Sequence, residues 1–85
     1  MFLHTTSVKH LGNYRLSVTF DNGESGEVDL SGELWGEMFA PLKDVALFAT
    51  AYQHPVMGTV AWENGADLAP EHLIDLMRHQ NKLAA

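Results

Sequence analysis

The chain contains no cysteine. That absence excludes disulfides, thiol nucleophiles, and zinc or iron–sulfur sites built on cysteine. No segment reaches the ~20 predominantly apolar residues that a membrane-spanning helix needs. The first ten residues carry neither a basic start nor an apolar run of signal-peptide length. We therefore expect a cytoplasmic, soluble protein that makes no contact with membranes.

Basic residues are scarce: five Lys and Arg stand against eleven Asp and Glu, for a net charge of −6. They are also scattered along the chain, at Lys9, Arg15, Lys43, Arg78 and Lys82. Binding to a phosphate backbone requires clustered basic side chains, because affinity comes from the release of counterions. The composition therefore argues against direct nucleic-acid binding by this chain alone, whereas its acidity can steer a basic protein partner.

The length of 85 residues predicts a single small domain over residues 1–85. We expect its core to lie within residues 8–79 and residues 80–85 to form a frayed tail. A chain of this size buries only roughly 60–65% of its unfolded surface. Its small core favours association with another small protein or with a second copy of itself.

The clearest secondary structure is a β-hairpin. Apolar and polar residues alternate in "YRLSVTF" (14–20) and again in "ESGEVDL" (24–30), with "DNG" between them. A two-residue turn at 22–23 would place acidic residues opposite the buried face of the first strand. A three-residue loop over 21–23 instead sets apolar residues opposite apolar residues or glycine. We predict the three-residue loop, with Gly23 in a left-handed conformation.

The other segments complete an α+β pattern. Residues 3–13 predict a strand with a bulge, because Val8 and Leu11 would otherwise point to opposite faces. Residues 30–44 predict a short helix and an irregular crossover, capped by Ser31, with both Leu34 and Trp35 pointing inward. The remaining elements expected are a helical turn at 45–48, two short strands within 49–53 and 59–62, and a last helix that begins at Pro70 and runs to about residue 79. Together these predict a small, mostly antiparallel curved sheet of about four or five strands, with one or two short helices and a C-terminal helix packed on it.

Three blocks of sequence resemble a known family, the bacterial domain of unknown function 2442 (DUF2442). They are "YRLSVTFDNGESGEVDL", "PLKDVALFATA" and "GTVAWENGADLAPEHL", within residues 8–76. The resemblance implies a curved antiparallel sheet with helices against it. It supplies no catalytic residues to carry over, and Glu63 stands where the family pattern has proline.

Members of that family differ in what accompanies the domain. Some relatives carry a helix-turn-helix segment after it. Others stand alone and are encoded beside another small protein, in an arrangement similar to toxin–antitoxin pairs. The resemblance implies the stand-alone form, without a C-terminal helix-turn-helix.

Histidine is the residue type that could support metal binding or catalysis. His72, Asp75 and His79 lie three and four residues apart on the last helix, a spacing at which imidazole and carboxylate groups can share a metal. Their position away from the apolar stripe is equally well explained by a solvated helix flank. We predict no catalytic residues, no cofactor and no metal, with these three as the weak candidates for ligands.

The stretch "VAWENGADLAPEHL" (60–73) reads as a corner between a strand and a helix. Trp62 fills the core, Asn64 and Gly65 turn the chain, and Asp67 accepts backbone N–H groups ahead of the helix. The alternative is that Trp62, Glu63 and Asp67 form the rim of a partner-binding groove, since Trp is a frequent interface anchor.

Two function classes follow from the sequence. The first is a non-enzymatic protein–protein interaction or regulatory accessory module, antitoxin-like in the sense of the family resemblance, which acts through a sheet edge or an apolar rim. The second is a small enzyme or metal-binding protein that uses His and carboxylate groups. A third possibility is a transcriptional regulator that acts through a DNA-binding partner.

Overall fold

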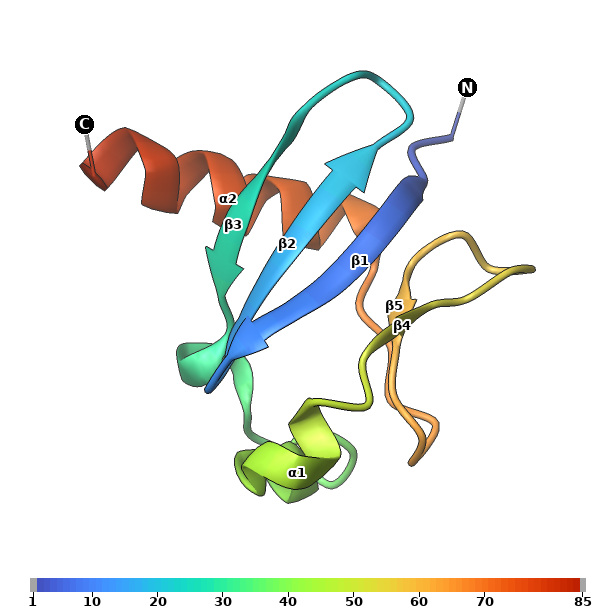
Figure 1. Ribbon diagram of the computed structural model, residues 1–85, viewed down its shortest axis with the longest axis vertical. Helices are drawn as coiled ribbons and strands as arrows, with labels where there is room; N and C mark the ends of the chain where they lie inside the picture. Colours follow the sequence, from blue (N-terminus) through green and yellow to red (C-terminus); the bar gives the residue numbers. More distant parts are fainter. Residues whose placement is uncertain (1, 85) are drawn as a thin grey trace.

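A computed structural model describes residues 2–84, including the side chains of residues 2–81. Within that range five strands form two antiparallel sheets (Figure 1). The first sheet has the order β1-β2-β3, from β1 (Thr5–Gly12), β2 (Arg15–Phe20) and β3 (Ser25–Asp29). The second pairs β4 (Tyr52–Gln53) with β5 (Val60–Ala61). The predicted α+β class is confirmed, although the strands divide between two sheets instead of forming one.

The hairpin between β2 and β3 has the predicted register. Val18 pairs with Gly26, and Leu16 pairs with Val28, so apolar residues face each other across the ladder. The N–H of Phe20 donates to the carbonyl of Glu24 at 2.8 Å and closes a loop of three residues. Gly23 has φ +91°, a conformation that glycine adopts without steric cost.

Strand β1 is irregular, as its poor alternation predicted. Its register against β2 shifts between Thr5 and Ser7 and again between His10 and Gly12. The first shift lets the buried Thr5 share the inner face with Val8 and His10, whereas Leu11 remains exposed. A bulge therefore reconciles the sequence with one buried face.

Four helical segments complete the described chain. Two short 3₁₀ turns, η1 (Ser31–Glu33) and η2 (Ala40–Lys43), form the crossover, and α1 (Val45–Phe48) follows directly. Helix α2 (Pro70–Ala84) begins at Pro70 as predicted and packs behind the first sheet (Figure 1). It continues to Ala84, five residues beyond the expected end. Ala85, the last residue of the predicted frayed tail, lies outside the described residues.

The predicted cap of η1 was wrong. The side chain of Ser31 makes no capping hydrogen bond, and its backbone N–H instead donates to the Oδ1 of Asp29 at 2.8 Å. An Asp two residues ahead can satisfy the first N–H group of a turn through its own side chain. The side chain that bonds to the start of η1 is therefore that of Asp29, the last residue of β3.

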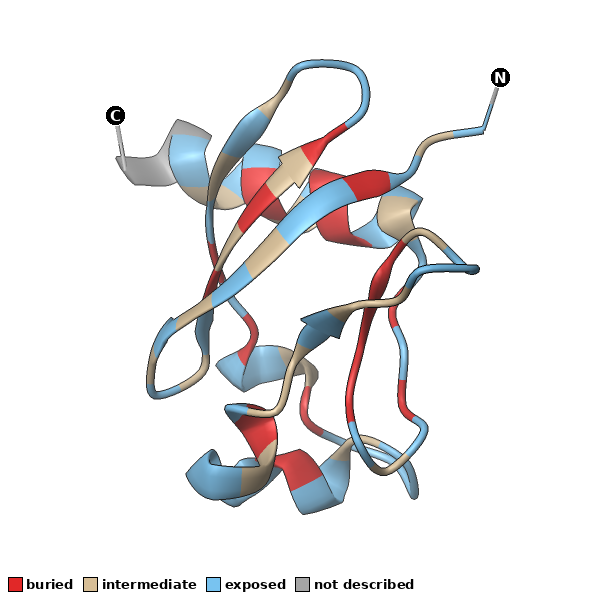
Figure 2. Cartoon of the chain, turned by 45° about the vertical axis from the view of Figure 1, so that its right-hand side comes forward, coloured by how far each residue is buried: buried red, intermediate tan, exposed pale blue. Residues whose placement is uncertain are grey.

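The core lies between the first sheet, α2 and the β4–β5 pair, where Figure 2 shows buried residues gathered on the facing sides of the elements. Trp62 is 1% exposed, which confirms its predicted place in the core. Its indole N–H donates to the carbonyl of Phe48 at 3.0 Å, and its ring lies 5.6 Å from the ring of Phe48. The buried indole is therefore both packed and hydrogen-bonded, as a buried Trp requires.

The prediction that Trp35 points inward was wrong, because its side chain is 72% exposed. Its neighbour Leu34 is buried as predicted, and the chain then turns at Gly36, which has φ +86°. Adjacent side chains of a non-helical segment point to opposite sides, so only one of the two can enter the core. Trp62 and Phe39, with ring centroids 5.9 Å apart, already fill the nearby space.

The two tryptophans provide a matched test of this fold. We expect Trp62→Ala to lower the free energy of unfolding by about 3–5 kcal/mol, because it removes a buried aromatic side chain and leaves a cavity. Trp35→Ala should change that free energy by no more than about 0.5 kcal/mol. Urea titrations followed by circular dichroism measure both values, and equal losses in the two variants would contradict the assignment.

Candidate partner-binding surface

The first candidate surface is the segment between η1 and η2, residues 34–39, which we call the Trp35 loop. Trp35 is 72% exposed and Met38 is 46% exposed, so two large apolar side chains of this loop face solvent. Exposed apolar side chains that cluster, unlike those scattered singly, mark interaction sites. The loop therefore offers an apolar contact area that folding leaves uncovered.

The Trp35 loop is held in place by contacts on both of its sides. Leu34 is buried, and the partly buried Phe39 packs its ring against Trp62. The side-chain amide of Asn64 donates to the carbonyl of Met38 at 2.9 Å, which ties the loop to the turn after β5. The N–H of Ala40 donates to the carbonyl of Gly36 at 2.9 Å. A loop fixed in this way loses little further conformational entropy when it binds.

The acidic residues are concentrated in the same part of the chain. Residues 16–42 contain no Lys, Arg or His, but contain six acids: Asp21, Glu24, Glu27, Asp29, Glu33 and Glu37. Several of them pair with groups from outside the stretch. Nη2 of Arg15 lies 3.5 Å from Oε2 of Glu27, and Nε2 of His72 lies 2.8 Å from Oε1 of Glu33. Glu37, two residues from Trp35, has no ion-pair partner among the side chains of residues 2–81, which adds negative charge to the loop.

The second candidate surface is the outer edge of β3, the outermost strand on the side away from β4 and β5 (Figure 1). Hydrogen-bonded pairs alternate along an antiparallel ladder. The bonds from Phe20 to Glu24 and from Leu30 to Tyr14, each 2.8 Å, identify the pairs that bond inward. Glu27 and Asp29 lie between them, so their N–H and C=O groups point away from β2.

Gln80 of α2 occupies part of this edge. The N–H of Asp29 donates to Oε1 of Gln80 at 2.7 Å, and Nε2 of Gln80 donates to the carbonyl of Asp29 at 2.8 Å. A carboxamide that makes both bonds presents the donor and the acceptor that a peptide group of a neighbouring strand would present. The Gln80 side chain thus occupies the position that the backbone of an added strand would take beside Asp29.

Helix α2 also crosses β3 near its other end. Nε and Nη2 of Arg78 both donate to the carboxylate of Glu24, with 2.9 Å for the Nε bond. The bond from Arg78 lowers the pKa of the Glu24 carboxyl and raises the pKa of the Arg78 guanidinium. Both side chains are partly exposed, so water screens the pair and its contribution to stability is modest.

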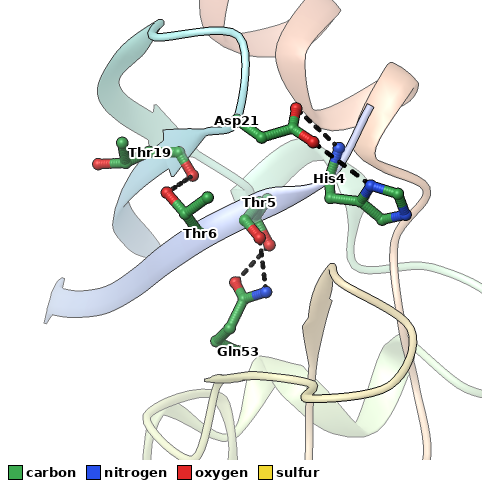
Figure 3. Close-up of polar contacts among 6 residues, drawn as sticks. All are labelled: His4, Thr5, Thr6, Thr19, Asp21 and Gln53. Carbon is green, nitrogen blue, oxygen red and sulfur yellow. Dashed lines mark hydrogen bonds and ion pairs between the residues drawn. The ribbon is translucent and has the colours of Figure 1, made fainter. Parts of the chain in front are cut away.

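A second glutamine, Gln53, meets the outer edge of β1 at its first residue, as Figure 3 shows. Nε2 of Gln53 donates to the carbonyl of Thr5 at 2.6 Å, and the Thr5 hydroxyl donates to Oε1 of Gln53. The N–H of Thr5 donates to the carbonyl of Gly58 at 2.8 Å. The β4–β5 pair therefore covers the start of β1, whereas the outward backbone groups of Val8 and His10 meet no hydrogen-bond partner from another part of the described chain.

The three residues predicted to rim a groove differ in their exposure. Trp62 is buried, so it is not available as an exposed anchor, whereas Glu63 and Asp67 are exposed. Asp67 was also expected to accept backbone N–H groups ahead of the last helix, but its side chain accepts no such bond from the described residues. Within the turn itself, Oδ1 of Asn64 accepts from the N–H of Ala66 at 3.1 Å. The corner is built from Asn64 and Gly65, which has φ +89°.

The weak metal candidates are not gathered into a site. Nε2 of His72 lies 2.8 Å from Oε1 of Glu33, which links α2 to η1, and Asp75 and His79 are exposed on the helix. Among the described side chains, no three His, Asp or Glu residues lie close enough together to hold a metal ion. His54 serves a turn, since its Nδ1 accepts from the N–H groups of Val56 and Met57.

Comparison with known proteins gives the family of the chain. The family described as "Protein of unknown function (DUF2442)" matches residues 5–79. This chain belongs to the DUF2442 family. A search of the curated proteins found no match.

One solved structure is similar to this DUF2442 domain. It is the crystal structure of NE0471 from Nitrosomonas europaea ATCC 19718, a protein for which DNA binding has been proposed. The TM-score is 0.81 and the sequence identity is 28%, over 96% of this chain. The match spans only 53% of that protein, so this chain corresponds to about half of it.

No helix within residues 2–84 is both long and apolar enough to cross a membrane.

The sequence analysis missed two residues of these surfaces. The exposure of Trp35 has no signal in the sequence, because its neighbours allow either Leu34 or Trp35 to point inward. Gln80 did leave a signal: it lies seven residues after Leu73 and three after Met77, on the same face of α2 as these buried residues. A polar residue that continues an apolar stripe is a candidate for a specific hydrogen bond.

Asp29 gives a pH-dependent contribution to the stability of this DUF2442 domain. The N–H of Ser31 bonds to the Asp29 carboxylate and lowers its pKa below the unfolded value of ~3.9. A lowered carboxyl pKa stabilises the fold above the unfolded pKa, and this gain is lost as the pH falls through the folded pKa. We therefore expect wild type to exceed Asp29→Asn in stability at pH 7 and the difference to shrink below about pH 4. Urea titrations at both pH values measure it, and a difference that is unchanged at low pH would contradict this.

Proposed function

We propose that this domain is a non-enzymatic protein–protein interaction module, which binds another small protein through the apolar rim of the Trp35 loop. The observation that carries the proposal is the 72% exposure of Trp35. Burial of a large apolar side chain is worth about 1.5–3 kcal/mol, which folding leaves unused here and binding can gain. Trp is also among the residues that most often dominate the energy of an interface.

The surroundings of the loop support recognition of a basic partner. The chain has a net charge of −6, and Glu37 lies two residues from Trp35. An acidic surface raises the rate of encounter with a basic protein and repels a second acidic copy of the same chain. A tryptophan face beside a carboxylate also suits an Arg or Lys side chain, through a cation–π contact and an ion pair.

In the cell such a module would act as a regulatory accessory protein. An antitoxin-like role is a finer form of the same proposal, in which the bound protein is a partner encoded nearby. It requires only a stable complex in which the Trp35 loop is covered, and no chemistry by the domain itself.

A second candidate function is transcriptional regulation through a DNA-binding partner. The similarity to about half of NE0471, for which DNA binding has been proposed, favours it. The net charge of −6 argues that the contact with DNA would come from the partner.

The interaction proposal predicts that Trp35 is an energetic anchor of the complex. A partner captured from the native host would first be purified and its binding to wild type measured by calorimetry. We expect Trp35→Ala to weaken binding by about 30-fold or more, which corresponds to the ~2 kcal/mol of a binding hot spot. The variant should stay folded, because the side chain is exposed.

Leu11→Ala provides a matched control, since Leu11 is also a large exposed apolar residue but lies on β1. It should bind like wild type. Equal affinities for the Trp35 and Leu11 variants would contradict the proposal, as would light scattering that shows only self-association of the domain.

The second candidate function makes a separate prediction. In a gel-shift assay at physiological salt, we expect the domain alone to leave promoter DNA unshifted and to retard it further when the DNA-binding partner is present. A salt-sensitive shift by the domain alone would mean that it contacts DNA directly.

A further inference from the structure

The edge of β3 has the geometry of a sheet that is ready to accept another strand. The backbone groups of Ser25, Glu27 and Asp29 point away from β2, because inward bonds alternate with outward ones along the ladder. Gln80 bonds to the backbone N–H and carbonyl of Asp29. No hydrogen bond from another part of the described chain reaches the backbone groups of Ser25 or Glu27. An unpaired row of this kind is a template for strand addition.

Gln80 meets that edge with the two bonds that an added strand would make. Its carboxamide both accepts from the N–H and donates to the C=O of Asp29. An incoming strand would have to displace this side chain in order to pair along the full length of β3. Displacement of Gln80 costs these two hydrogen bonds, and an added strand can replace them with equivalent bonds to Asp29.

The charges along the edge indicate what kind of segment fits. Glu24, Glu27 and Asp29 all lie on or beside β3. Arg15 and Arg78 pair with the two glutamates, but both arginines are about half exposed and can turn away. Two copies paired through β3 would set acids against acids, which destabilises a ladder. Glu27 and Asp29 share the outer face of β3, so a segment with basic residues on that face would instead set a cation beside each of these two acids.

We propose that the outer edge of β3 is a strand-addition site for an extended basic segment of another protein, and that Gln80 is the gate this segment displaces. The proposal rests on the proposed function as a protein-binding module, but it uses a surface distinct from the Trp35 loop. It therefore makes predictions that the Trp35 variant does not share.

Two synthetic peptides of about six residues, the common strand length, test the site. One alternates Val with Lys and the other alternates Val with Glu. We expect the lysine peptide to shift the amide NMR signals of Ser25, Glu27 and Asp29 in the wild-type domain, and to slow hydrogen exchange at Glu27. The glutamate peptide should shift none of them.

Gln80→Ala tests the gate. The free variant should exchange the Asp29 amide faster than wild type while the rest of its spectrum stays dispersed, which shows that the fold is intact. It should bind the lysine peptide about tenfold more tightly, since the two hydrogen bonds between Gln80 and Asp29 no longer have to be broken. Gln53→Ala is the matched control, because it removes the corresponding glutamine from the β1 edge, and its affinity should equal that of wild type.

Trp35→Ala separates this proposal from the proposed function. It should bind the lysine peptide as wild type does, even where it has lost the natural partner. The strand-addition site is overturned if the lysine peptide leaves the β3 amides unshifted in Gln80→Ala, if both peptides shift them equally, or if Trp35→Ala abolishes peptide binding.

Discussion

The burial of Trp62 is the constraint on which the rest of this structure depends. Its indole bonds to the carbonyl of Phe48 and packs against the ring of that residue. Phe48 in turn lies 5.4 Å from Tyr14 and 5.8 Å from His10, ring centroid to ring centroid. This continuous series of aromatic contacts joins the β4–β5 pair, α1 and the first sheet. With strands of only two residues, the second sheet gains its stability from this packing rather than from its own ladder.

One consequence concerns the other tryptophan. A domain of 85 residues has room for few large side chains in its core. Trp62 and Phe39 occupy the space beside the crossover, and Leu34 fills what remains. Trp35 is thereby left in solvent on a loop that is otherwise well anchored. The same packing that stabilises the fold produces the surface through which we propose that it binds.

A second consequence concerns the edges of the first sheet. Each outer strand is met by a glutamine from another element. Gln53 of β4 bonds to the carbonyl and the hydroxyl of Thr5 on β1, and Gln80 of α2 bonds to the N–H and the carbonyl of Asp29 on β3. At β1, the segment between β4 and β5 adds a second contact, because the N–H of Thr5 donates to the carbonyl of Gly58. At β3, two side chains of α2 make the contacts: Gln80 bonds to Asp29 at one end of the strand, and Arg78 bonds to Glu24 just before the other end. A glutamine thus protects one residue at each edge, and the acidic side chains of Glu27 and Asp29 are what distinguish β3 from β1.

The sequence by itself determined the local features of this protein. Alternation in 14–20 and 24–30 defined the β2–β3 register, because the wrong register would bury acids, and Pro70 marked the start of α2. Only the tertiary structure decided which of Leu34 and Trp35 enters the core, and that Gln80 reaches Asp29 across 51 residues of sequence. The physical reason is that periodicity and turn chemistry act between neighbours in sequence. The exposure of a tryptophan or the partner of an amide depends on how distant elements share one small core.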